Sequence, residues 1–375
     1  MRMEILFVQS EIEDIAKKVK TGQRLDLASG VRLYQTQDLL TLGYLADLVR
    51  QRKNEDKAYY IVNQHINHTN VCLNLCPLCA FGRKSTDPGA YTLTLAEIEA
   101  KVLACRNKGI KELHIVGGLN PALPLDYYVQ MLRCGRSALP EAVIQAFTAV
   151  EIDFLAQINH LTIREVLKVL MEAGLDSLPG GGAEIFSPRV RSLICPRKIS
   201  GQRWLEIHAA AHRLGVRTNA TMLYGHVETI TERVEHLIRL RELQDLTGGF
   251  LAFIPLPFHP QNTQLKKTMD LSAPTGYDDL KTLAVARLML DNFDHIKAFW
   301  IMLGPKLAQV ALSFGVDDLD GTVREEKIAH EAGAQTAQYL PEKEIINLIK
   351  SAGRVPVERD TLYSAVSHRT SVVRE

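Results

Sequence analysis

The sequence has no long apolar run and almost no net charge. No stretch of about 18 apolar residues occurs, so nothing in it predicts a segment that spans a membrane. The net charge of +1 removes the electrostatic case for a nucleic-acid partner. Acidic residues interrupt the N-terminus and no small-residue cleavage site follows, so we expect no signal peptide. Together these absences predict a cytoplasmic protein.

Cysteine is also scarce, and it is unevenly placed. Six cysteines in 375 residues is far below the density of a disulfide scaffold. Three of them, Cys72, Cys76 and Cys79, fall in one short segment with the spacing C-x3-C-x2-C. A structural zinc site needs a second ligand pair at close spacing, and none is present. The other cysteines are isolated and are expected in the core: Cys105, Cys134 and Cys195.

Three clustered thiolates can hold three irons of a cubane cluster and leave the fourth iron without a protein ligand. Closed iron–sulfur sites usually have four cysteines. An open iron is what a small molecule needs in order to bind the cluster and receive its electron. The spacing is that of radical S-adenosylmethionine enzymes. In that chemistry the amino and carboxylate groups of S-adenosylmethionine chelate the iron, and reductive cleavage gives a 5′-deoxyadenosyl radical.

Short β-branched runs alternate with amphipathic stretches along most of the chain. Eight strands are predicted, at residues 59–66, 112–116, 143–147, 175–178, 216–222, 250–254, 296–301 and 316–319. Capping boxes that begin at Thr94, Thr162 and Thr229 predict the starts of three helices. This alternation favours an α/β fold, a (βα)8 TIM-type radical S-adenosylmethionine barrel with helical N- and C-terminal extensions. We expect a helical preface at 1–57, the barrel at 58–321 and a closing helical segment at 322–375.

Two glycine-rich turns follow predicted strands, where the active site of such a barrel lies. Gly117 and Gly118 let a ligand approach the backbone, so we expect them to contact S-adenosylmethionine; an ordinary turn is the alternative. Three consecutive glycines at 180–182 precede Glu184, which could accept hydrogen bonds from a ribose or an ammonium group. The Lys and Ser/Thr of a phosphate loop are missing after these glycines. A solvated carboxylate is the alternative for Glu184.

Further polar residues follow the later strands. Arg191 is suited to carboxylate recognition and is a candidate cofactor-binding residue, with solvation at the surface as the alternative. His226 and His259 are candidate catalytic residues that could orient a substrate or move protons. A lone histidine is more often structural, so that interpretation stays open for each of them.

Several blocks of the sequence resemble those of the aminofutalosine synthases, a radical S-adenosylmethionine family of the futalosine route to menaquinone. The resemblance runs from about residue 24 to 363. Beside the cysteine loop, it rests on blocks at 114–119, 146–152, 173–186, 220–228, 241–250 and 353–360. One departure from the usual pattern is Asn120, where the family commonly has histidine.

The resemblance implies a 4Fe–4S cluster on Cys72, Cys76 and Cys79, with S-adenosylmethionine as co-substrate. It implies a small aryl enolpyruvyl ether substrate, 3-[(1-carboxyvinyl)oxy]benzoate, and an electron donor such as flavodoxin or ferredoxin. The adenosyl radical adds to the vinyl carbon, the aryl group migrates, CO2 is lost and 6-amino-6-deoxyfutalosine forms. Two alternatives stay open: the hydrogen-abstracting cyclase that makes cyclic dehypoxanthine futalosine, and a non-catalytic iron–sulfur protein.

Overall fold

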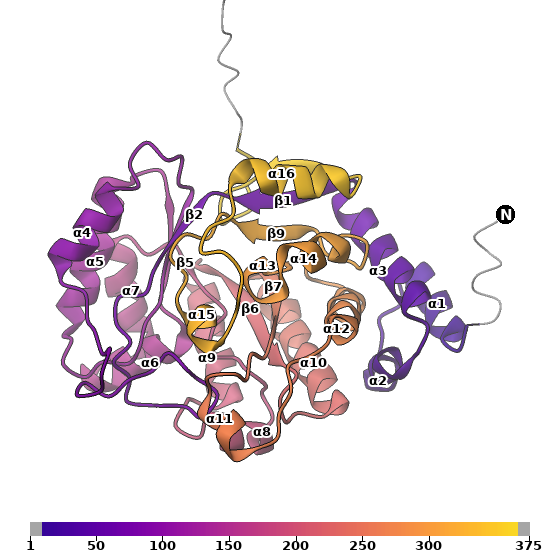
Figure 1. Ribbon diagram of the computed structural model, residues 1–375, viewed down its shortest axis with the longest axis horizontal. Helices are drawn as coiled ribbons and strands as arrows, with labels where there is room; N and C mark the ends of the chain where they lie inside the picture. Colours follow the sequence, from indigo (N-terminus) through magenta and orange to yellow (C-terminus); the bar gives the residue numbers. More distant parts are fainter. Residues whose placement is uncertain (1–9, 367–375) are drawn as a thin grey trace, which may run out of the picture.

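The structure is a computed structural model that describes residues 10–366. Its centre is a seven-stranded sheet in the order β2-β3-β4-β5-β6-β7-β8 (Figure 1). The strands are β2 (Asn63–Ile66), β3 (Glu112–Ile115), β4 (Val143–Ala146), β5 (Ser177–Leu178), β6 (Arg217–Tyr224), β7 (Phe250–Pro257) and β8 (His295–Ile296). Every neighbouring pair is parallel, so the carboxyl ends of all these strands meet at one end of the sheet.

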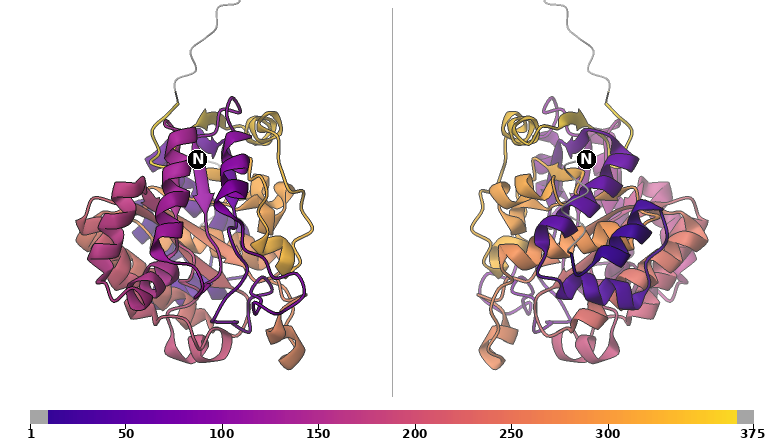
Figure 2. Two further views of the ribbon diagram at one scale, coloured as in Figure 1. Left: turned by 90° about the vertical axis from the view of Figure 1, so that its left-hand side faces the viewer. Right: turned by 90° about the vertical axis from the view of Figure 1, so that its right-hand side faces the viewer.

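Helices connect the strands and pack on one another around the sheet (Figure 2). The longer ones are α4 (Leu95–Leu103), α5 (Leu125–Ala138), α6 (Ala149–Ile158), α7 (Ile163–Ala173), α9 (Gly201–Arg213), α10 (Ile230–Thr247) and α12 (Gly276–Met289). Short helices lie in the loops: α8 (Pro188–Ile194), α11 (Gln264–Thr268), α13 (Trp300–Leu303), α14 (Pro305–Ala311) and α15 (Ile328–Ala332).

The three predicted capping boxes are confirmed. In each, the threonine hydroxyl accepts from the N–H of the glutamate three residues on, and that glutamate accepts from the threonine N–H. A fourth capping box, Thr148 with Glu151, begins α6, a helix that the sequence analysis does not predict. Each box satisfies backbone donors that a helix start leaves unpaired, so these threonines set where the helices begin.

The predicted strand at 59–66 is divided in two. Its first half is β1 (Lys57–Ile61), which leaves the central sheet and pairs with β9 (Asp318–Gly321) and β10 (Val355–Glu358). Side-chain bonds replace the ladder at the division. The Asn63 N–H donates to Thr322 Oγ1 (3.1 Å), and Asn63 Oδ1 accepts from the Val323 N–H (2.8 Å).

This division changes how the barrel closes. The α/β barrel prediction is confirmed, but the eighth strand forms its ladder with β1 instead of joining the central sheet. Single parallel bridges, Lys297 with Asp318 and Gln64 with Arg324, join the segment from β9 onward to the two edge strands. The central sheet is therefore a partial barrel.

Helical segments flank the barrel on both sides in sequence. α1 (Glu13–Lys20), α2 (Leu27–Gln35) and α3 (Leu39–Asn54) precede it, and α2 and α3 pack on α10 and α12 (Figure 2). α16 (Glu342–Ser351) follows it and leads into β10, a strand that the sequence analysis does not predict. The divisions at 57/58 and 321/322 stay predictions. Among residues 10–366, no helix has the length and apolar character needed to cross a membrane.

A fully buried ion pair ties α12 to the start of β9. Arg287 pairs with Asp317, and both side chains are inaccessible to solvent. The Arg287 guanidinium also donates to the carbonyl of Gly315 (2.7 Å), and Asp317 accepts from the N–H of Ile296 (2.8 Å). One carboxylate therefore holds the last helix of the barrel wall, β8 and β9 together.

We expect Asp317→Ala to lower the free energy of unfolding by about 3–5 kcal/mol, because it leaves the buried Arg287 charge without its carboxylate partner. Urea unfolding monitored by circular dichroism measures this change. The matched control is Asp270→Ala, which removes a fully exposed carboxylate from a surface pair with Lys266 and should leave the unfolding midpoint unchanged. Equal midpoints for the two variants would contradict the role assigned to Asp317.

Candidate active site

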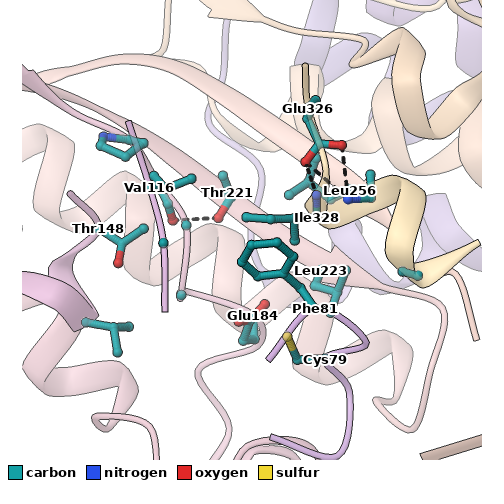
Figure 3. Close-up of a pocket in the computed structure, with 18 of the residues that line it drawn as sticks. Cys79, Phe81, Val116, Thr148, Glu184, Thr221, Leu223, Leu256, Glu326 and Ile328 are labelled. Atoms are coloured by element: carbon teal, nitrogen blue, oxygen red, sulfur yellow. Dashed lines mark hydrogen bonds between the residues drawn. The ribbon is translucent and has the colours of Figure 1, made fainter. Parts of the chain in front are cut away.

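A cavity of about 340 Å³ lies inside the barrel and reaches the carboxyl ends of its strands. Side chains two residues apart on the same strand line it, because alternate side chains of a strand point to the same face. β3 contributes Glu112 and His114, followed by Val116 just beyond its end, and β6 contributes Asn219, Thr221 and Leu223. Figure 3 shows Val116, Thr221, Leu223, Leu256, Phe81 and Ile328 around the interior of this cavity.

The three predicted ligands Cys72, Cys76 and Cys79 are free thiols that line this cavity together. Backbone bonds shape their loop: the Cys79 N–H donates to the carbonyl of Cys76 (2.9 Å), and the Cys72 N–H to that of Arg83 (2.9 Å). The Arg83 guanidinium donates to the carbonyls of Ala80 (2.5 Å), Phe81 and Gly82. The loop that presents the thiols is thus folded by its own hydrogen bonds.

The donor set fits an iron–sulfur cluster. Among residues 10–366, no three His, Cys, Asp or Glu side chains converge on a position for a single metal ion. A cubane does not need such a point, because each cysteine thiolate binds a different iron. Burial raises the pKa of Cys76 to about 12, against the opposing effect of the Lys198 charge. Binding of a metal must therefore supply the free energy that forms this thiolate.

Gly117 and Gly118 line the cavity, as the prediction of cofactor contact requires, but they also have a packing role. A Cβ on Gly117 would lie 2.4 Å from the His68 ring, and one on Gly118 would lie 2.2 Å from the Val71 carbonyl oxygen. Their N–H groups donate to Glu151 Oε1 (3.0 Å) and to the carbonyl of Thr69 (2.8 Å). Contact with the cofactor stays a prediction for both glycines.

Glu184 lines the cavity with its backbone in the left-handed region, at φ 47°. Its carboxylate forms an ion pair with Lys198, another lining residue that the sequence analysis did not single out. Burial opposes ionisation of Glu184, yet Lys198 keeps its pKa below the ordinary value, and Glu184 in turn raises the pKa of Lys198. Glu184 is therefore a buried anion at the cavity wall, and its contact with the cofactor stays a prediction.

Arg191 and His226 do not line the cavity. Arg191 is buried and donates to the backbone carbonyls of Ala183 (2.7 Å) and Ile199. His226 Nε2 donates to the carbonyl of Leu223 (3.0 Å), while its Nδ1 accepts from the Val227 N–H (2.7 Å). For His226 these bonds favour the structural alternative. For Arg191 the alternative of solvation at the surface is wrong, because the side chain is buried and binds backbone carbonyls.

His259 does line the cavity, where its Nε2 donates to the Met302 carbonyl (3.0 Å) and burial lowers its pKa. It therefore stays a candidate catalytic residue. Asn120 lies in the turn after Gly118, where it donates to Thr92 Oγ1 (3.0 Å) and accepts from the Ala122 N–H (3.0 Å). Its side chain has a local structural role.

The sequence analysis missed the carboxyl group of Glu151. This residue lines the cavity, and burial raises its pKa to about 7 despite hydrogen bonds from Thr148 and the Gly117 N–H. The signal that could have found it is the Thr148-x-x-Glu151 capping box directly after a predicted strand.

A group of polar side chains, all buried except the half-buried His114, also lines the interior of the barrel and was missed. Its members come from β2, β3, β4, β6, β9 and the residue after β8: His65, Glu112, His114, Gln145, Asn219, Lys297 and Asp320. Polar residues inside a predicted buried strand, such as Glu112-x-His114, are the signal that could have found them. We call this group the interior polar cluster.

Comparison with known proteins places the chain in a family. The Radical SAM superfamily matches residues 66–240, and the CofH/MqnC C-terminal region matches residues 247–372. Similar solved structures include methylornithine synthase (TM-score 0.71, 17% identity, 91% of this chain and 96% of that one). Another is the FeFe-hydrogenase maturase of Carboxydothermus hydrogenoformans (TM-score 0.72, 16% identity, 94% and 80%). At these identities the two structures support the fold alone.

Whole-length relatives are more specific. The aminodeoxyfutalosine synthase of Thermus thermophilus is 50% identical over 353 residues, which is 94% of this chain and 95% of the relative. The synthase of Streptomyces coelicolor is 44% identical, covering 93% and 92%. A 5-amino-6-(D-ribitylamino)uracil–L-tyrosine 4-hydroxyphenyl transferase of Methanothermobacter thermautotrophicus is 41% identical, covering 88% and 90%. With its cysteine loop in the barrel cavity, the chain belongs to the aminodeoxyfutalosine synthase family of radical S-adenosylmethionine enzymes, which use a 4Fe–4S cluster and S-adenosylmethionine.

Proposed function

We propose that this enzyme joins the adenosyl group of S-adenosylmethionine to 3-[(1-carboxyvinyl)oxy]benzoate and forms 6-amino-6-deoxyfutalosine in menaquinone biosynthesis. The observation that carries the proposal is 50% identity, over nearly the full length of both chains, to a protein named aminodeoxyfutalosine synthase. We also propose a cytoplasmic location and a low-potential electron donor such as flavodoxin or ferredoxin.

Different residues of the cavity would have different roles in this reaction. When bound, the cluster and S-adenosylmethionine supply an adenosyl radical, which is the difficult chemistry. Cys72, Cys76 and Cys79 would hold the cluster at the mouth of the barrel. Phe81 and Leu256 contribute apolar surface that excludes water, which protects a reactive species from side reactions.

The start of α15 also contributes apolar surface to the cavity. Ile328 lines the cavity and begins α15. Glu326 caps the start of this helix: its Oε1 accepts from the N–H of Ile328 (2.7 Å) and of Ala329 (3.1 Å) (Figure 3). This capping would hold the apolar side chain of Ile328 over the reacting atoms.

The fate of the adenosyl group tests the proposed reaction. We expect label from adenosyl-labelled S-adenosylmethionine to appear in a product of the mass of aminodeoxyfutalosine, with methionine released in equal amount. Mass analysis of the reduced enzyme with both substrates measures this. Free 5′-deoxyadenosine should be a minor product, because addition retains the adenosyl group. If 5′-deoxyadenosine formed in step with turnover of dehypoxanthine futalosine, the cyclase would replace the synthase.

Substitution of single cysteines tests the cluster ligands. We expect Cys76→Ala to lose the iron and the activity, whereas the reconstituted wild type should hold about four irons per chain. The most demanding control is Cys195→Ala, because Cys195 is buried close enough to act electrostatically on Cys76 but does not line the cavity. Loss of iron in Cys195→Ala, with retention in Cys76→Ala, would overturn the assignment.

A pair of substitutions tests the role of Glu184. We expect Glu184→Ala to raise the Kd for S-adenosylmethionine about 10- to 150-fold, the effect of one charge-assisted hydrogen bond of about 1.5–3 kcal/mol. Adding Lys198→Met to Glu184→Ala provides the control. If the single substitution acted only by leaving the Lys198 charge unpaired, the double variant would recover affinity. A persistent loss in the double variant supports direct contact, and recovery contradicts it.

A further inference from the structure

The interior polar cluster lies deeper in the barrel than the cysteine loop and the glycines that follow β3. Glu112 is the first residue of β3 and His114 lies two residues farther along, while Gly117 and Gly118 at the mouth come after the strand ends. His65 on β2 and Gln145 on β4 are in register with His114. The cavity is therefore polar at its mouth and at its deep end.

Lys297 belongs to the deep end. Its side chain is 3% exposed and lines the cavity. Lys297 forms a parallel bridge with Asp318, two residues before Asp320 of the same cluster, and its charge acts on Glu112 and His65. The apolar side chains of Val116 and Leu256 line the same cavity. A ligand with a charged group at each end and an apolar middle would match this arrangement.

Lys297 also lacks a close partner. Among residues 10–366, no carboxylate lies within 4.0 Å of its ammonium and no acceptor within hydrogen-bond distance. The other enclosed lysines differ: Lys198 pairs with Glu184, and Lys281 donates to the carbonyls of Tyr34 (2.9 Å) and Thr36 (2.8 Å). A mostly buried ammonium that lines the cavity and forms no ion pair with the protein is suited to bind an anionic ligand there.

The nearby carboxylates do not fill this role. Glu112 accepts from Thr361 Oγ1 (2.8 Å) and Asn63 Nδ2 (3.3 Å). Asp318 is held in a fully buried ion pair with Arg359, and among the described residues Asp320 lies beyond ion-pair distance of Lys297. Asn219 also lines the cavity, but its unpaired Oδ1 is an acceptor and cannot bind a carboxylate. Within the interior polar cluster, Lys297 is therefore the group suited to an anion.

We propose that Lys297 binds the carboxylate on the aromatic ring of the substrate, an inference that rests on the proposed function. The substrate has two carboxylates. One is attached to the vinyl group that reacts, so it must lie at the mouth with the cysteine loop. The other is on the ring, meta to the ether oxygen, and reaches the deep end. Lys297 is thereby a positioning residue that sets how far the vinyl carbon stands from the mouth.

The experiment removes either partner of this contact. Binding is measured by equilibrium dialysis without S-adenosylmethionine, so that no turnover occurs. The ligands are 3-[(1-carboxyvinyl)oxy]benzoate and the same ether with an unsubstituted phenyl ring. We expect loss of the ring carboxylate to raise the Kd of the wild type about 10- to 100-fold. Lys297→Met should raise the Kd of the full substrate by the same factor and leave that of the phenyl ether unchanged.

Three further measurements make the result decisive. Lys297→Arg should recover part of the discrimination, because it retains the charge. Lys281→Met removes a buried lysine outside the cavity and should change neither Kd. Iron content reports whether each variant folds and loads its cluster. Equal losses for both ligands in Lys297→Met, or no preference of the wild type for the full substrate, would overturn the assignment.

Failure of the proposed function would be read separately. If the wild type bound the full substrate but made no adenosylated product from it, the proposed reaction would be wrong. The dialysis result for Lys297 would still decide whether this residue recognises the ring carboxylate.

Discussion

The position of the cysteine loop depends on a close backbone contact at Gly118. This residue follows β3, and its N–H donates to the Thr69 carbonyl at the base of the loop (2.8 Å). A Cβ at this position would lie 2.2 Å from the Val71 carbonyl oxygen and 3.1 Å from Cys72 Cβ. Only glycine can therefore seat the first cysteine against the end of β3, and the rest of the loop, braced by Arg83, follows from that contact.

The two lysines of the cavity illustrate two ways of enclosing a charge. Lys198 has Glu184 as its partner, and the pair lies near Cys76, where the lysine charge opposes the effect of burial on the thiol. Lys297 has only longer-range interactions with carboxylates that have other tasks. An enclosed ion pair fixes the positions of its two side chains, whereas an enclosed charge without a close partner is available to bind a ligand of opposite charge. The lysine at the mouth thus has a carboxylate partner, whereas the lysine at the deep end has none at close range.

Much of the fold could be predicted from the sequence because its signals are local. Each of the eight predicted strands overlaps an observed one, although most of 296–301 lies beyond β8 and α13 begins within it. Thr94, Thr162 and Thr229 begin helices as their capping boxes indicate. The division of 59–66 could not be predicted, since it arises from bonds between Asn63 and the backbone and side chain of residues 322–323, far away in sequence.

The same contrast between local and long-range determinants applies to the residues of the site. The cysteine loop is a local pattern, and it lines the cavity where strand ends meet. Arg191 and His226 also follow strands, but their side chains turn to backbone carbonyls, a choice that depends on tertiary packing. The neighbours of Lys297 are likewise set by segments distant in sequence. Lys198 is only 14 residues from Glu184, but their pairing depends on how the segment that contains α8 folds, which the sequence pattern does not show.

Specificity within this family must arise away from the cysteine loop. The cluster and S-adenosylmethionine supply the radical chemistry, so recognition of the substrate depends on the other side chains that line the cavity. Relatives named for transfer of the 4-hydroxyphenyl group of tyrosine act on a ring that carries a hydroxyl. The substrate proposed here carries a carboxylate on its ring. The ammonium of Lys297 at the deep end pairs with a ring carboxylate. A ring that carries a hydroxyl would leave this buried charge without a counter-ion, which lowers the binding affinity for that ring.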